Sequence, residues 1–285
     1  MRNLKTVNVI LAASMLAASP FLAPSTFAQD APEKSKTADD SLPTPREIID
    51  RFIEVTGGME AYKKHTSRTS SGYFEMPAMG LRGPMTVKQS SPNLMLVSIE
   101  FPGMGSMQQG YDGTIAWSID PMSGARLITG KQLDQMKREA DFFNSVDILK
   151  NFDTSKTVGI ADFGGEKCHQ IKLTSSDGIT NAYYSVETGL ARGSKSVAAT
   201  PQGEIPSITT ISGYKDFGGV MTPTLTVVEA MGQKQQIVTE SVSYDDLPTE
   251  EFALPEAIKT LAGASAPAEE TESADEKTNE GASGS

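Results

Sequence analysis

Residues 93–120 read NLMLVSIEFPGMGSMQQGYDGTIAWSID and hold three strand-length pieces separated by two turn signals. In the first piece, apolar side chains occupy every second position: Met95, Val97, Ile99 and Phe101. This period of two is typical of a half-buried β-strand. The turn signals are Pro102-Gly103 and Asp112-Gly113, and the second is a strong hairpin signal. The stretch therefore predicts an antiparallel meander with one apolar face.

The third piece of this stretch alternates in the same way, through Ile115, Trp117 and Ile119. The alternation places the only tryptophan of the chain on the same face as two isoleucines. No catalytic group lies on this apolar face. The stretch therefore informs the fold more than the chemistry.

Similar strand-length segments continue on both sides of this meander, divided by turns rich in glycine, proline and aspartate. They comprise residues 67–76, 81–89, 126–129, 157–162, 167–174, 179–186, 190–198, 205–214, 220–231 and 233–244. We expect about 10–11 antiparallel strands, with turn signals every 8–12 residues or so. This spacing is typical of a β-sandwich or a β-barrel.

One helix precedes the strands. Thr44 is a suitable N-cap, Pro45 suits the first helical position, and Glu47 completes a capping box. Four apolar residues follow at helical spacing, and Gly57-Gly58 ends the pattern. They are Ile48, Ile49, Phe52 and Ile53. We expect this helix to bury one face.

A second helical pattern interrupts the strands at residues 130–143, and residues 147–152 are expected to add a short helix. The apolar positions Leu133, Met136, Ala140 and Phe143 recur at spacings of three and four. The opposite side carries charged residues. Such an amphipathic insertion either caps the end of a barrel or forms a lid over a ligand cavity.

The N-terminal residues 1–28 have the pattern of a secretory signal peptide cleaved after Ala28, with a basic start and a short apolar run. Residues 29–42 are polar and aperiodic, as in a disordered linker. Residues 43–261 form the expected folded domain. Residues 262–285 are acidic and of low complexity, and we expect them to be disordered. The chain is therefore expected to be exported.

The net charge and the cysteine content of the chain argue against several classes of function. The formal net charge is −11, and loss of Arg2 and Lys5 with the signal peptide would make it −13. An acidic chain is a poor ligand for nucleic acids and for anionic membrane surfaces. Since Cys168 is the only cysteine, an internal disulfide is excluded. We expect no nucleic-acid partner and no more than peripheral or transient membrane contact.

The residues offer little for catalysis. Cys168 and His169 are neighbours on a predicted strand, so their side chains point to opposite faces and do not form a dyad. Paired carboxylates stay open as an alternative, because Glu75, Glu100, Asp112 and Asp120 lie on neighbouring strands or turns. We expect no enzymatic activity, no metal site and no cofactor, and a hydrolase is the weakest hypothesis.

Nine methionines fall between residues 59 and 136, and several lie in or beside turns. Methionine is flexible and polarisable, and it recurs on surfaces that accept varied apolar partners. One interpretation is that these side chains fill an irregular core. The other is that they form an apolar opening or rim.

The chain resembles the periplasmic lipoprotein-carrier superfamily, the outer-membrane lipoprotein-sorting proteins of the LolA/LolB type, over residues 43–255. The resemblance rests on the opening helix that ends in Thr56-Gly57-Gly58 and on four later motifs. They are QGYDG at 109–113 before Trp117, YY at 183–184, ETGL at 187–190 and YKD at 214–216. It implies a curved antiparallel sheet, an unclosed half-barrel whose apolar concave face is covered by helices. It also implies binding of acyl chains and no catalytic residue.

Two hypotheses follow. In the first, the protein is periplasmic and binds the acyl chains of a lipid or lipoprotein, as a possible carrier to the outer membrane. The predicted binding residues are Met85, Val87, Met95, Val97, Ile99, Ile115, Trp117, Met136 and Phe143. In the alternative, the same fold is an envelope sensor or interaction module that recognises a protein partner.

Overall fold

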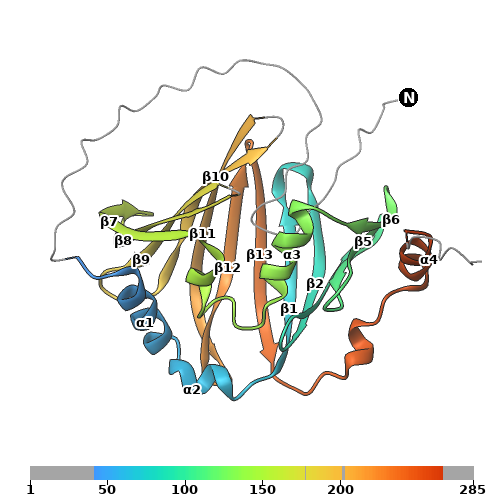
Figure 1. Cartoon of the computed structure of the whole chain (residues 1–285), viewed down its shortest axis with the longest axis horizontal. Coiled ribbons are helices and arrows are strands. Elements are labelled where there is room, and N and C mark those ends of the chain that lie inside the picture. The colour runs from blue at the N-terminus through green and yellow to red at the C-terminus, as the bar shows by residue number, and fades with distance from the viewer. Residues whose placement is uncertain (1–41, 177, 201–202, 266–285) are drawn as a thin grey trace, which may run out of the picture.

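The computed structural model describes residues 42–176, 178–200 and 203–265 (Figure 1). Their strands form one 13-stranded sheet in the order β6-β5-β4-β3-β2-β1-β13-β12-β11-β10-β9-β8-β7, with every neighbouring pair antiparallel. The strand bounds are β1 Ser67–Met76, β2 Leu81–Ser90, β3 Leu94–Phe101, β4 Gly105–Tyr111, β5 Ala116–Asp120, β6 Gly124–Ile128, β7 Thr154–Phe163, β8 Glu166–Ser175, β9 Gly178–Ser185, β10 Ala191–Thr200, β11 Gly203–Phe217, β12 Val220–Ala230 and β13 Gln233–Ser243.

The sheet is not closed, because β6 and β7 lie at its two ends and each has one strand neighbour. The predicted unclosed antiparallel half-barrel is confirmed. The structure has 13 strands, one for each of the three pieces of the meander and the ten flanking segments, so the expected number of about 10–11 was too low. The short segment at residues 124–128 is one of them, because it pairs along its full length with β5.

The sheet consists of two hairpin meanders, β1–β6 and β7–β13. Within each meander every strand pairs with its neighbours in the chain. The two are joined by the pairing of β1 with β13, in which Phe74 lies opposite Ile237. This pairing brings together segments separated by most of the folded domain.

The opening helix α1 spans Pro45–Val55 and has the predicted capping box, in which Glu47 N donates to Thr44 Oγ1 at 3.3 Å. All four predicted apolar residues of its stripe are buried. After Gly57, which has φ 124°, a second short helix begins that the sequence did not predict, α2 at Gly58–Lys63. A Cβ at Gly57 would lie 2.2 Å from the carbonyl oxygen of Gly219, so the chain can approach the β11–β12 turn closely only without a side chain there.

The predicted helical insertion is present as α3, Lys131–Ala140, and is followed by a 3₁₀ helix, η2, at Ile148–Asn151. A further 3₁₀ turn, η1 at Pro77–Met79, joins β1 to β2. None of the helices in the described part of the chain is long and apolar enough to cross a membrane.

The C-terminal segment adds η3, Thr249–Phe252, and α4, Glu256–Ser265, which contact β3 and β6 respectively. Residues 262–265, which we expected to begin a disordered tail, belong to α4. Ile258 is fully buried, and its packing holds α4 against the protein. The predicted signal peptide and most of the predicted linker and tail lie outside the described residues.

Two apolar clusters lie on the concave face of the sheet. The α3 cluster comprises Phe74, Met76, Met85, Met95, Val97, Ile99, Phe101, Met107, Tyr111, Ala116, Ile128, Met136 and Ala140. The α1 cluster comprises Ile48, Ile49, Phe52, Ile53, Val146, Ile171, Leu173, Ala182 and Tyr184. Each cluster therefore joins one meander to the helix that covers it.

Candidate functional site

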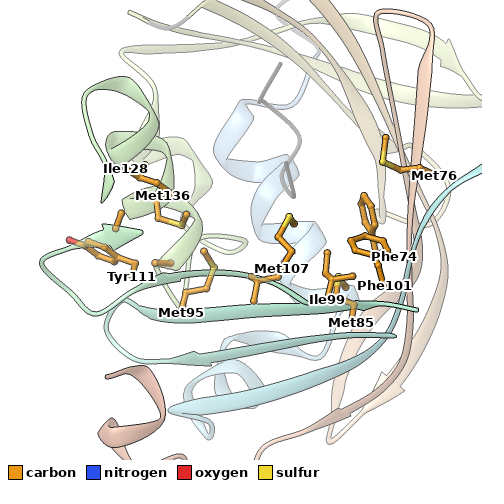
Figure 2. Packing of buried hydrophobic residues seen from close by; sticks show 13 residues of the cluster. Phe74, Met76, Met85, Met95, Ile99, Phe101, Met107, Tyr111, Ile128 and Met136 are labelled. Atoms are coloured by element: carbon orange, nitrogen blue, oxygen red, sulfur yellow. The ribbon is translucent and has the colours of Figure 1, made fainter. Parts of the chain in front are cut away.

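The candidate site is the concave face of β1–β6 beneath α3. Strand register aligns its side chains in rows, so that Met95 lies opposite Tyr111, Tyr111 opposite Ala116, and Ala116 opposite Ile128. Figure 2 shows these side chains together with methionines from β2, β3, β4 and α3. The face is thus built largely from flexible thioether side chains and aromatic rings.

Six of the nine predicted binding residues meet at this face. Met85, Met95, Val97, Ile99 and Met136 belong to the α3 cluster, and Val87 packs against it. The other members of the cluster were not predicted as site residues. Met107 and Tyr111 alternate with Gln109 between them along β4, so a period of two would also have placed them on this face.

Helix α3 lies on this face through Met136, which is 1% exposed, and Ala140, which is fully buried. Leu133 packs at the margin of the same cluster. At its N-terminus, the N-cap residue Gly130 makes no side-chain cap hydrogen bond. The position of α3 therefore depends on apolar packing and on the polar contacts described next.

Two side-chain amides from the sheet reach α3. Gln109 Nε2 lies 3.8 Å from Met136 Sδ, and Gln89 Nε2 donates to the carbonyl oxygen of Glu139 at 3.0 Å. Behind Gln89, Arg68 donates from Nε and Nη2 to Gln89 Oε1 at 2.9 and 2.6 Å. The chain of contacts links β1 through β2 to the last turn of α3.

The carboxyl group of Glu139 lies in this same turn. Burial raises the pKa of Glu139 from 4.5 to about 7, against the opposing effects of a hydrogen bond from Gln135 and the charge of Arg138. Gln135 Nε2 donates to Glu139 Oε1 at 2.7 Å. Because desolvation disfavours the ionised carboxylate, ionisation of Glu139 opposes its burial at the contact of α3 with the sheet.

The structure corrects the predicted position of Trp117. Trp117 lies opposite Gly110, and Gly110 opposite Leu96, which lies opposite Lys88. This row faces away from Met95, and Lys88 forms an ion pair with Glu251 of η3 at 2.6 Å. Trp117 is therefore buried on the outer, convex face.

The predicted role of Ile115 changes with that of Trp117. Ile115 is half-buried and precedes β5, two residues from Trp117, so the alternation that groups them leads away from the α3 cluster. Glycine is required beneath the indole, since a Cβ at Gly110 would lie 2.7 Å from the ring of Trp117. The alternation along β5 was correct, but the assigned face was not.

Phe143 also lies elsewhere than predicted. It packs against the α1 cluster, while its neighbour Phe142 forms an edge-to-face contact with it at a centroid distance of 5.2 Å. Helix α3 ends at Ala140, and Asp141 leaves the helical conformation with φ −59° and ψ 115°. The chain therefore turns away from the α3 cluster before Phe143, because the helix is shorter than its apolar pattern.

Helix α3 closes the concave face beneath it off from solvent in this structure. Every member of the α3 cluster is at most 7% exposed. An apolar ligand could reach this face only if α3 moved away from the sheet. The arrangement is that of a covered apolar wall with a helix as its cover.

Other chemistry in the described residues is sparse. They contain no group of three or more His, Cys, Asp or Glu side chains that could hold a metal ion. Cys168 lies on the outer face with Phe163 and Tyr183, and burial raises the pKa of its thiol. The prediction that the protein is not an enzyme stays a prediction.

The sequence matches no family model and no curated protein. Solved structures similar to this chain include a LolA superfamily protein from Nitrosomonas europaea, with 13% identity and a TM-score of 0.52 over 75% of this chain and 99% of that one. A DUF1329 family protein from Desulfovibrio piger has 12% identity and a TM-score of 0.54 over 73% of this chain and 96% of that one. The resemblance to the LolA superfamily is thus confirmed for the fold.

Proposed function

We propose that this protein, which has the fold of the LolA superfamily, binds the acyl chains of a lipid or lipoprotein between α3 and the concave face of β1–β6. The observation that carries the proposal is a wall of flexible apolar side chains under a short helix whose N-cap residue makes no side-chain cap hydrogen bond. Methionine-rich walls adapt to chains of different shape. The signal-peptide pattern of residues 1–28 supports a periplasmic location.

The proposed mechanism is exchange of one apolar cover for another. When α3 moves away, it exposes the α3 cluster, and an acyl chain takes its place. Burial of each methylene contributes about 0.8 kcal/mol. The affinity for the acyl chain then depends on the difference between this free energy and the packing free energy that Met136 and Ala140 lose when α3 moves. The acyl chain is released when α3 returns to the sheet.

The test is hydrogen exchange of the mature protein with and without palmitate, together with mass spectrometry of lipid that copurifies. We expect palmitate to accelerate exchange in the amides of α3. The amides of α1 serve as an internal control, because α1 covers the other cluster. Absence of copurified lipid together with an unchanged exchange rate in α3 would refute the proposal.

A protein-binding function is favoured by a separate observation. Four methionines lie at the tips of consecutive hairpins along one end of the sheet, and each is 40–55% exposed. They are Met79, Met104, Met122 and Met231. A binding partner for this row would be captured equally well by the apo and the palmitate-bound protein. Replacement of all four by Gln would abolish that capture and leave palmitate binding unchanged.

A further inference from the structure

Arg68 is a basic side chain on the concave face that the proposed function does not yet use. It lies on β1 opposite Gln89, which lies opposite Met95 of the α3 cluster. Its guanidinium carbon is 5.5 Å from the centre of the Phe142 ring, just beyond the end of α3. A positive charge is therefore fixed at one end of the apolar wall.

The groups that hold Arg68 are neutral. The amide oxygen of Gln89 accepts both of its hydrogen bonds, and the ring of Phe142 offers only its face. These bonds use two of the five N–H donors that a guanidinium carries. The remaining donors have no protein acceptor within the described part of the chain, and the side chain is half-buried.

Within the described residues, no carboxylate balances the charge of Arg68. Among the ion pairs formed by described residues, none includes Arg68. The ionisable groups that affect it are Tyr244 and Tyr62, which are uncharged at neutral pH, while burial lowers the pKa of Arg68. The nearby Glu139 carboxyl interacts with Gln135 and Arg138 instead. Because a guanidinium does not lose its proton in proteins, it stays charged without a counter-ion.

We propose that Arg68 binds the anionic head group, a carboxylate or a phosphate, of an amphiphile whose chain lies on the α3 cluster. This inference rests on the proposed function and adds the chemical class of the ligand. The planar fork of a guanidinium matches the oxygens of both anions. A half-buried cation without a carboxylate partner gains more from such an anion than a fully solvated one does.

The geometry orients the amphiphile. Arg68, Ser70, Gly72, Phe74 and Met76 point to the concave face along β1, and Arg68 is at the end of this row. From Arg68 to Met76 the strand extends over roughly 26 Å, at about 3.3 Å per residue. A head group at Arg68 therefore directs its chain along β1 and β2, past Val87 and towards Phe74.

The experiment compares ligands that share a chain and differ in head group. Binding of palmitate, palmitoyl lysophosphatidic acid and hexadecanol to the full mature chain is measured by isothermal titration calorimetry. We expect at least one of the two anions to bind about tenfold more tightly than hexadecanol, as one charge-assisted interaction predicts. The stronger of the two identifies a carboxylate or a phosphate as the preferred head group.

Two variants of Arg68 separate recognition of the head group from binding of the apolar chain. Arg68→Gln should remove the preference for the anion and leave hexadecanol affinity unchanged, whereas Arg68→Lys should keep part of it. Arg82→Gln is the matched control, since Arg82 lies over Tyr73 on the outer face and pairs with Glu75 at 2.8 Å. Circular dichroism of each variant confirms folding, and the wild-type comparison does not depend on it.

The possible results distinguish failure of the head-group site from failure of acyl-chain binding. Equal affinity of the wild type for both anions and for hexadecanol would overturn the role of Arg68 and leave acyl-chain binding intact. A preference that persists in Arg68→Gln would also overturn it. Failure of all three ligands to bind would reject the proposed function itself and with it the head-group site.

Discussion

Replacement of Glu139 by Gln should make the attachment of α3 insensitive to pH. Glu139 lies in the last turn of α3, its backbone carbonyl accepts from Gln89, and burial raises its pKa from 4.5 to about 7. Below about pH 4.5 the carboxyl is neutral in the folded and the unfolded chain. As the pH rises towards 7 the unfolded chain loses this proton first, so the folded state becomes progressively less stable until the pH passes about 7.

The magnitude follows from the shift. Each unit of pKa corresponds to about 1.4 kcal/mol, so the shift of Glu139 corresponds to roughly 3 kcal/mol at alkaline pH. This is an upper value because Glu139 is half-buried and because α3 can detach locally at a lower cost. The amide of Glu139→Gln removes the ionisable group and can still accept the hydrogen bond from Gln135.

The assay is urea unfolding combined with hydrogen exchange of residues 131–140 at pH 5.5 and 8.5. We expect the wild type to lose stability, or protection of α3, at the higher pH, and Glu139→Gln to lose much less. Glu54→Gln is the control, because Glu54 is exposed on α1 and pairs with Arg51 at the surface. An equal pH dependence in the wild type and Glu139→Gln would refute the reasoning.

Three further predictions concern packing and helix capping. Met136→Ala leaves a cavity at a buried site, so it should lower the unfolding free energy in urea by about 2–5 kcal/mol or increase hydrogen exchange in α3. The exposed control Lys137→Ala should change little, and an effect of Met136→Ala no larger than that of this control would contradict the prediction. Gly110→Ala should lower the melting temperature and alter near-ultraviolet circular dichroism, since its Cβ would overlap the indole of Trp117; unchanged spectra would show that the indole is placed differently. Thr44→Ala removes the cap of α1 and should lower the free energy of unfolding, measured by thermal unfolding, by about 1 kcal/mol. An unchanged stability would mean that the capping box is not formed in solution.

The sequence was sufficient to predict most of the local structure. The alternation of Met95, Val97, Ile99 and Phe101 and the capping box at Thr44 each depend on a few neighbouring residues. Chain stereochemistry and the burial of one face then determine strand or helix. For the same reason six of the nine predicted binding residues are found together on one concave face.

The face on which Trp117 lies could not be read from its strand. Alternation separates Trp117 from Ala116 but does not say which of the two points inwards. Here the small Ala116 faces α3, while the outer face also becomes apolar because η3 and α4 cover it. Phe143 was misplaced for a similar reason, since the chain leaves the helical path at Asp141 to reach the second cluster.

Local periodicity was thus enough to predict the strands, the helices α1 and α3, and the apolar content of the concave wall. It could not predict that β1 pairs with β13, that Trp117 faces outwards, or that Arg68 contacts Gln89 at the end of α3. Each of these depends on contacts between segments far apart in the chain. Their free energy comes from packing and charge burial that no single segment contains.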